Sequence, residues 1–310
     1  MNRMAGCLSV LVIGMAGMTQ AARGTVIYWT DPDAATIQRF DTQGTGAIED
    51  LLSAEDGLSS PRGIALDVAA GKMYWADNGT DKIRRANLDG SQVEDLISSG
   101  LSFPADLALD KSAGKMYWAD RDENAIRRAN LDGTNVQTVR SGVNQPYFME
   151  LDLADGKVYW SEFDSPTIHR ANLDGTGTVE DVVTGLDRVR DIALDLAGGM
   201  LYWGDRDSHK IQRMRLDGAG GVQSVFTKSD GLDRPHGLAL DVAAEVLYWT
   251  DTELHSVRWG NMDGSGAVQM IPEDDRMQGP WGIAIIPVPE PGGWMALAVG
   301  VWGVMKRRRA

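Results

Sequence analysis

Tyr74-Trp75-Ala76-Asp77, an aromatic pair followed by an acid, is the stretch that decides the fold, because it recurs along the whole chain. Successive tryptophans of this motif are separated by 46, 43, 42, 43 and 46 residues. A period in that range is typical of an array built from one repeated supersecondary unit. The other five copies are Tyr28-Trp29-Thr30-Asp31, Tyr117-Trp118-Ala119-Asp120, Tyr159-Trp160-Ser161-Glu162, Tyr202-Trp203-Gly204-Asp205 and Tyr248-Trp249-Thr250-Asp251.

Each copy stands between two further repeated segments. Ile-x-Arg-Ala-Asn-Leu-Asp-Gly follows the aromatic pair, most clearly at residues 83–90 and 126–133, and a segment like the Pro-Arg-Gly-Ile-Ala-Leu-Asp of residues 61–67 precedes it. Asp-Gly is turn chemistry, and the segments between the turns are short and rich in aromatic and β-branched residues, which is typical of strands. Four short strands in each unit of about 40–45 residues predict the blades of an all-β propeller.

The two ends of the array predict a closed ring. The chain enters at a second strand, residues 26–30, with no first strand before it, and it leaves after an additional first strand, residues 281–286. Pairing of these two segments completes a sixth blade and removes the sheet edges that would otherwise be free. We therefore expect a six-bladed β-propeller closed by N-terminal strands that pair with the C-terminal inner strand.

On these motifs the repeats resemble those of the low-density lipoprotein receptor class B family, the YWTD six-bladed β-propellers. The resemblance extends over residues 25–287, whereas the Gly-His and Trp-Asp motifs of WD40 repeats are absent. In animal receptors such propellers are followed by cysteine-rich modules, which this chain lacks. The resemblance therefore implies the fold, and it does not imply a receptor function.

Residues 1–22 have the features of a signal peptide. Arg3 gives a basic start, residues 8–18 are mostly apolar, and residues 19–22 are small enough for cleavage. The one cysteine, Cys7, precedes the apolar stretch, a poor position for the alternative, lipoprotein processing. Cleavage removes this cysteine, so we expect neither disulfides nor thiol chemistry in the propeller of residues 23–287.

Residues 288–310 resemble the PEP-CTERM sorting signal of bacteria, which exosortase-type enzymes process. Pro289-Glu290-Pro291 precedes a short apolar segment, residues 294–305, and a basic end, residues 306–309. The apolar segment is short for a full membrane span, and the basic residues favour the cytoplasmic side. An ordinary C-terminal anchor is the alternative. Both readings place the propeller outside the cytoplasm, in the cell envelope or extracellular, with membrane contact through the tail only.

The charge balance excludes several classes of partner. The chain has 44 acidic and 30 basic residues, a formal net charge of −14, and processing of both ends would leave 25 basic residues. A strongly acidic surface repels nucleic acid and anionic lipid. Basic proteins, divalent cations and neutral glycans remain compatible with this charge.

Residues at the channel mouth differ between blades, as binding residues do. The start of the first strand and the end of the second lie on the same face, so the residue after each repeated proline should line the mouth. Asn78, Arg121, Phe163 and Arg206 should surround it farther out. Aromatic residues and arginine dominate interaction hot spots, although these positions also suit ordinary loop residues. The predicted ligand-binding residues are Arg62, Tyr147, Phe148, Arg190, His236 and Trp281.

The repeated residues have a structural interpretation instead. Six equivalent Tyr-Trp pairs suit six equivalent interfaces between blades, and no single ligand requires all of them. Arginines recur on the third strands, and we expect Arg85 to pair with Asp77 and Arg128 to pair with Asp120. Such partly buried pairs position the strands more than they stabilise them.

One inner strand carries an acid where the others have alanine. Glu150 occupies that position, and Asp106 and Asp191 stand two residues earlier in the neighbouring repeats. Alternation along a strand places these acids on equivalent sides. Three converging carboxylates could bind Ca²⁺ or supply a general base with a raised pKa. The alternative is that Glu150 pairs with Arg190 or reaches solvent.

The sequence thus favours an exported, non-enzymatic binding or scaffold protein that recognises a protein or polysaccharide at the channel mouth. The alternative is a calcium-dependent hydrolase or lactonase that uses the axial acids, and a third possibility is a purely structural surface-layer component. Neither a nucleophile elbow nor a phosphate-binding glycine loop is present, so no catalytic residue and no cofactor other than Ca²⁺ is predicted.

Overall fold

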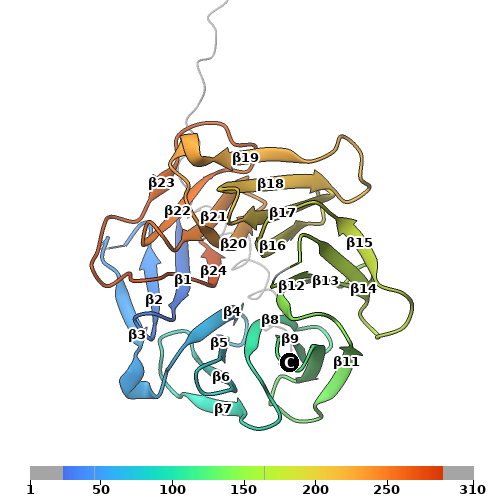
Figure 1. Ribbon diagram of the computed structural model, residues 1–310. Coiled ribbons are helices and arrows are strands. Elements are labelled where there is room, and N and C mark those ends of the chain that lie inside the picture. Colours follow the sequence, from blue (N-terminus) through green and yellow to red (C-terminus); the bar gives the residue numbers. More distant parts are fainter. Residues whose placement is uncertain (1–23, 45, 164, 289–310) are drawn as a thin grey trace, which may run out of the picture. The chain divides into compact units, whose positions relative to one another are not determined.

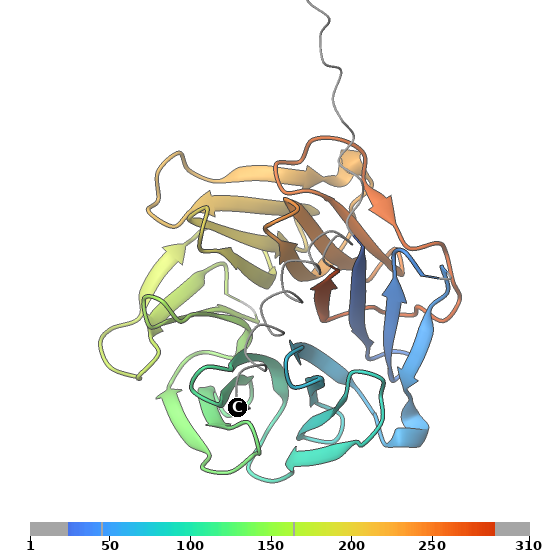
Figure 2. The ribbon, with the colours of Figure 1, turned by 180° about the vertical axis from the view of Figure 1, so that it is seen from behind.

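Six four-stranded antiparallel sheets surround a central axis in the computed structural model, which describes residues 24–44, 46–163 and 165–288. Residues Gly24–Val288 form one compact unit (Figures 1 and 2). In five sheets the strand order follows the sequence from the axis outward. The predicted fold, an all-β propeller with six blades, is confirmed. Among the described residues no helix is long and apolar enough to cross a membrane.

The first three blades contain the strands up to residue 141, together with the last strand of the chain. Their bounds are β24 (Ile283–Pro287), β1 (Thr25–Asp31), β2 (Thr36–Asp41) and β3 (Glu49–Leu52) in the first; β4 (Pro61–Asp67), β5 (Lys72–Asp77), β6 (Lys82–Asn87) and β7 (Glu94–Ile97) in the second; and β8 (Pro104–Asp110), β9 (Lys115–Asp120), β10 (Ala125–Asn130) and β11 (Gln137–Ser141) in the third.

Two short 3₁₀ turns, η1 (Ala54–Asp56) and η2 (Lys228–Asp230), precede the inner strands of the second and sixth blades. The other three blades follow the same plan as the first three. The strands are β12 (Pro146–Asp152), β13 (Lys157–Glu162), β14 (Ile168–Asn172) and β15 (Glu180–Val183); β16 (Val189–Asp195), β17 (Met200–Asp205), β18 (Lys210–Arg215) and β19 (Gln223–Thr227); and β20 (Pro235–Asp241), β21 (Val246–Asp251), β22 (Ser256–Asn261) and β23 (Gln269–Met270).

The tyrosine and tryptophan of each repeat bind neighbouring blades together. Adjacent strand residues point to opposite faces of a sheet, so each pair contributes to two interfaces. Tyr74 packs in one hydrophobic cluster with Trp118 of the next blade, and Tyr28 packs with Trp75 in the same way. The hydrophobic cluster between the sixth and the first blade joins Tyr248 to Trp29, which lie at opposite ends of the sequence. Every repeated tryptophan is at most 1% exposed.

The acid that ends each second strand holds the loop that leads into the first strand of its own blade. Asp77 accepts hydrogen bonds from the backbone N–H groups of Ser59 and Ser60, at 3.3 and 3.0 Å. Asp31 does the same for Gln278 and Gly279, at 2.7 and 3.0 Å, and so joins the two ends of the ring. Backbone donors thus satisfy these buried carboxylates.

The predicted ion pairs Asp77–Arg85 and Asp120–Arg128 are wrong by one residue. Arg84 lies 3.9 Å from Asp77, and Arg127 lies 3.3 Å from Asp120. Arg84 stands directly opposite Trp75, and therefore shares its face with Trp75 and Asp77. A shift of one residue places a side chain on the other face, where Arg85 covers Tyr74 and donates to the Leu131 carbonyl of the next blade. Arg128 donates to Gln137 instead.

The last strand closes the ring by pairing with the first. β24 runs antiparallel to β1, with Tyr28 opposite Ala284 and Trp29 opposite Ile283. Just before β24, the Trp281 N–H donates to the Thr30 carbonyl at 2.8 Å, and the Gly282 N–H donates to the Thr30 hydroxyl at 3.0 Å. The closing segment therefore reaches the channel mouth in a fixed position.

The turns predict a stability difference between two glycines with similar backbone conformations, Gly133 of an Asp-Gly turn and Gly114, which follows Ala113. A Cβ on Gly133 (φ 83°) would lie 2.3 Å from the Leu96 carbonyl of the preceding blade, whereas one on Gly114 (φ 64°) would meet nothing within 4 Å. We expect Gly114→Ala to lower the free energy of unfolding by about 1 kcal/mol and Gly133→Ala by roughly 3 kcal/mol, because only the second change creates a clash. Urea denaturation measures both, and equal losses would contradict this packing.

Candidate functional site

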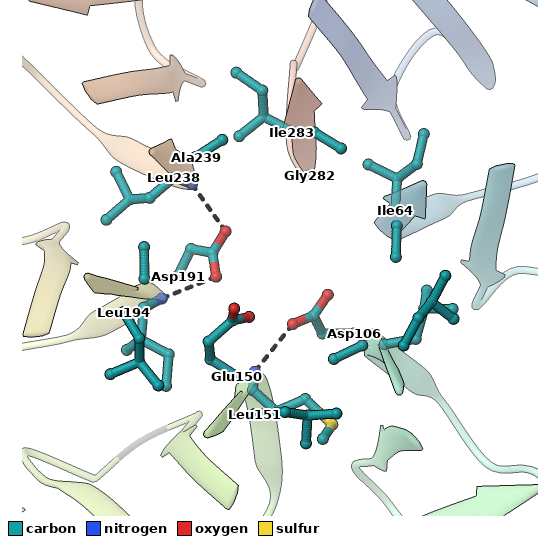
Figure 3. A pocket seen from close by; sticks show the side chains of 18 of the residues that line it. Ile64, Asp106, Glu150, Leu151, Asp191, Leu194, Leu238, Ala239, Gly282 and Ile283 are labelled. Atoms are coloured by element: carbon teal, nitrogen blue, oxygen red, sulfur yellow. Dashed lines mark hydrogen bonds between the residues drawn. The ribbon is translucent and has the colours of Figure 1, made fainter. Parts of the chain in front are cut away.

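The six inner strands line a central channel with a cavity of about 340 Å³. Figure 3 shows the side chains of Asp106, Glu150 and Asp191 pointing into it, and leucine, isoleucine and alanine make up most of its lining. Asp106 on β8, Glu150 on β12 and Asp191 on β16 are its acidic lining residues. The three acids that the sequence singled out therefore face one cavity, from three neighbouring blades.

Two of the three axial acids are engaged by the backbone of the next blade. Asp106 accepts a hydrogen bond from the Met149 N–H at 2.9 Å, and Asp191 accepts from the Leu238 N–H at 2.8 Å (Figure 3). Both amides follow a β-bulge near the start of an inner strand, where pairing with the second strand is interrupted. These carboxylates therefore cap backbone donors that the bulges would otherwise leave unpaired.

Glu150 lies between these two acids. Burial, together with the charge of Asp106, raises the pKa of Glu150 to about 8. Burial also raises the pKa of Asp106 to about 7 and that of Asp191 well above its ordinary value. Within the described residues, no group of three or more His, Cys, Asp or Glu side chains is arranged to hold a metal ion, and no ion pair joins Glu150 to Arg190. The calcium site stays a prediction.

The six predicted ligand-binding residues meet at the start of the inner strands. We call them the mouth cluster: Arg62, Tyr147, Phe148, Arg190, His236 and Trp281. The His236 ring lies 3.7 Å from the Trp281 ring between centroids, and the Arg62 guanidinium carbon lies 3.8 Å from the Trp281 ring centroid. Tyr147 contacts Phe148 and Trp281, with centroid distances of 5.2 and 6.3 Å, and Arg190 lies 5.2 Å from the Tyr147 ring.

β-Bulges aim these side chains at the axis. On β4, Pro61 pairs with Asp77 and Ile64 with Trp75, so Arg62 and Gly63 stand opposite one residue. The same irregularity occurs at Tyr147 and Phe148, at Arg190, and at His236. An extra residue in a strand bends it and redirects side chains, which is common next to functional sites.

Most of the mouth cluster is buried, and its role in ligand binding stays a prediction. Tyr147, Phe148, Arg190 and His236 are 3%, 1%, 2% and 2% exposed, and only Arg62 and Trp281 are partly exposed. Six strands converge near the axis, and Ala105 leaves space there, so the large neighbouring side chains fill the mouth by packing on one another. The cluster is a plug with an accessible edge.

Accessible side chains form a rim around this plug. Arg121 lies between two partly exposed aromatic rings, 4.2 Å from Phe103 and 4.4 Å from Phe163. Arg206 is also partly exposed. The sequence placed Arg121, Phe163 and Arg206 on this face, but it gave no indication of Phe103, which precedes Pro104 with a φ of 61°. Phe103 lies 6.3 Å from Tyr147 between ring centroids and so extends the aromatic cluster outward.

The mouth is electropositive although the chain is acidic. Neither Arg62 Nε and Nη1, nor Arg190 Nε, nor either ring nitrogen of His236 has a hydrogen-bond partner among the described residues. Burial lowers the pKa of Arg190 to about 10, and burial together with Arg190, Arg206 and Arg62 lowers the pKa of His236 well below its ordinary value. The net charge of the whole chain therefore does not indicate the local charge at the channel mouth, where arginines gather.

Residues 71–111 match the family model of low-density lipoprotein receptor repeat class B. Mouse (Mus musculus) nidogen-2 is 40% identical over 78 residues, 25% of this chain and 5% of nidogen-2. Mouse low-density lipoprotein receptor-related protein 5 is 39% identical over 72 residues, 23% of this chain and 4% of that protein. The chain thus matches a small part of these relatives.

Two solved structures share the fold of this chain. A chain in the crystal structure of a nidogen/laminin complex superposes with a TM-score of 0.75 at 22% identity, over 86% of this chain and 100% of that chain. Virginiamycin B lyase from Staphylococcus aureus gives a TM-score of 0.56 at 17% identity, over 72% and 73%. At these identities the similarity establishes the fold alone.

The raised pKa of Glu150 predicts a pH-dependent stability. Its pKa in the folded state, about 8, exceeds the ordinary value of 4.5, so its contribution is fully present below pH 4.5 and lost as pH rises through 8. Glu150→Gln stays neutral, and we expect it to be about 1–3 kcal/mol more stable than the parent at pH 9, after allowance for water in the channel.

Urea denaturation between pH 5 and 9 measures this difference. The exposed acid Glu273, in the loop before β24, gives the matched control, and Glu273→Gln should follow the parent at every pH. A Glu150→Gln variant whose advantage does not grow with pH would contradict the assigned environment.

Proposed function

We propose that this protein is an exported, non-enzymatic binding or scaffold protein of the bacterial envelope or extracellular matrix. Its channel mouth holds a protein partner. The single observation that carries this proposal is the rim, where Arg121 lies between Phe103 and Phe163 above the buried plug. Arginine and aromatic side chains held in place by packing are the residues that dominate protein interfaces.

The distribution of variation among the repeats supports a binding role for this face. Positions that pack the blades, such as Tyr74 and Trp75, recur in all six repeats. Positions at the mouth instead carry a different residue in almost every repeat, and they meet in one place through the bulges. A rigid ring that presents such a set offers preorganised side chains, which lowers the entropy lost on binding.

The relatives support a protein as the partner. One of the superposed structures is a nidogen/laminin complex, in which one protein is assembled with another. We carry this kind of role, and not the named partner, to the present chain. A polysaccharide ligand is the alternative from which the experiment must distinguish a protein partner.

The chain ends support export as part of the proposal. The signal-peptide features of residues 1–22 lie outside the described residues, and so does the PEP-CTERM-like tail of residues 288–310 except for residue 288. Both features rest on the sequence alone. An exosortase-type enzyme would process the tail. The intact mass of the chain, purified from its own host, would show whether the tail has been processed. The hydrolase alternative rests on the axial acids alone, of which Asp106 and Asp191 already bond backbone amides.

Site-specific cross-linking in the producing cells tests the binding face. A photoreactive residue at Phe163, on the rim, should capture a protein partner. One at Val136, 46% exposed and next to an outer strand, should not. The physical reason is that only the rim combines accessible aromatic surface with guanidinium groups. Equal capture at both positions, or capture at Val136 only, would overturn the assignment of this face.

A further inference from the structure

At the mouth, guanidinium nitrogens of Arg62 and Arg190 and both ring nitrogens of His236 are buried without a hydrogen-bond partner among the described residues. Arg190 Nη1 donates only to the neighbouring Val189 carbonyl, at 3.4 Å. Arg190 and His236 are each 2% exposed, and the free donors include Arg190 Nε and Arg62 Nε and Nη1. The Nε1 atoms of all six repeated tryptophans are also unpaired, so a single free N–H is not distinctive here. The mouth differs because charged groups from separate blades converge there.

The arginines farther out contrast with this inner pair. Arg121 lies 3.3 Å from Asp122, Arg206 lies 4.0 Å from Asp207, and Arg234 lies 2.6 Å from Glu253. No ion pair joins Arg62 or Arg190 to any acid of the described residues. The outer arginines are therefore paired directly with acids, whereas Asp33 and Asp207 act on Arg62 and Arg190 without forming an ion pair.

The surroundings of His236 contain cations and aromatic rings. Arg62 on β4, Arg190 on β16 and Arg206 after β17 are the charged groups that act on it, while Phe148 on β12 and Trp281 before β24 pack against its ring. All of the charged groups that shift the pKa of His236 are thus cations. A neutral imidazole offers one donor and one acceptor, and a guanidinium stays charged, so the arrangement calls for an anion from outside.

We propose that Arg62, Arg190 and His236 form a subsite for the carboxylate of an aspartate or glutamate side chain on the protein partner. This proposal rests on the proposed function, since it assigns the chemistry of that partner. Guanidinium groups bind carboxylates through charge-assisted, often bidentate hydrogen bonds. The partly exposed Arg62 and Trp281 stand at the entrance.

The shape of the entrance favours an amino-acid side chain over a sugar acid. Arg62 stacks on Trp281 at 3.8 Å, and the groups that need a partner lie beneath this pair. A carboxylate on one or two methylene groups can pass such a contact, whereas a uronic acid presents its carboxylate directly on a ring. The rim rings of Phe103 and Phe163 would then contact the backbone on either side of the acidic residue.

Titration of the full chain with short peptides tests the subsite. The probes are acetyl-Gly-Asp-Gly-amide and the uncharged acetyl-Gly-Asn-Gly-amide, with glucuronate and sulfate as further anions. The readout is the imidazole NMR signal of His236, assigned with His236→Gln. The Asp peptide should shift this signal saturably and raise the pKa of His236, because a bound carboxylate offsets the neighbouring cations.

Variants separate a subsite from a general attraction of anions. Arg190→Gln should weaken the Asp peptide about tenfold to a hundredfold, the usual loss for a hydrogen bond between charged groups. Arg190→Lys, which keeps the charge, should retain part of the binding and guards against a folding defect. Arg234→Gln is the matched control, because Arg234 already pairs with Glu253, and it should bind like the parent.

The peptide titration and the cross-linking experiment together distinguish the carboxylate subsite from the proposed function. Equal shifts with the Asp and Asn peptides, or undiminished binding by a folded Arg190→Gln variant, would overturn the subsite. A larger effect from glucuronate or sulfate would overturn its assignment to a protein side chain. If the partner cross-links at Phe163 but the Asp peptide has no effect, the carboxylate subsite fails and the proposed function stands. If the peptide binds but no protein cross-links at the rim, the proposed function fails.

Discussion

The pairing of β24 with β1 is the constraint on which the rest of the structure depends. A linear row of blades would leave an unpaired sheet edge and an uncovered hydrophobic face at each end. Ile283–Pro287 completes the first blade, and Tyr248 then packs with Trp29 as the other five tyrosine–tryptophan pairs do. Closure also carries Trp281 to His236 and Arg62, so one pairing both seals the ring and completes the mouth cluster.

Repetition and divergence have separate physical roles in this chain. Residues that recur in each repeat bind blade to blade, as Trp75 and Asp77 do, because every interface has the same shape. The bulged positions of the inner strands face the axis, where no such repetition is imposed. There Arg62 and Arg190 place positive charge beside the imidazole of His236, on an otherwise acidic chain. The stability of the ring allows this unpaired charge to be held in place.

The fold could be predicted from the sequence because period, motif and turn chemistry all indicate the same architecture. The number of blades followed from the six motif copies and the additional first strand, and the meeting of Asp106, Glu150 and Asp191 at one cavity followed from strand alternation. The details that failed depend on shifts of one residue or on side-chain volume. Arg84 replaced Arg85 beside Asp77 because register selects the face, and the burial of Tyr147 and Phe148 depends on space left by Ala105. Neither effect is encoded in a local pattern, and net charge cannot reveal a local excess of the opposite sign.

Hydrogen exchange of the full chain, read at residues 25–31 and 283–287, tests the closed ring most directly. Amides in a buried strand pair exchange only when that pair opens, so their protection reports the pairing itself. The structure predicts that these two segments are protected as strongly as β4 and β5, the corresponding pair of the second blade. Exchange of residues 283–287 at the rate of the exposed turns would contradict the closed ring, and with it the position of Trp281 at the mouth.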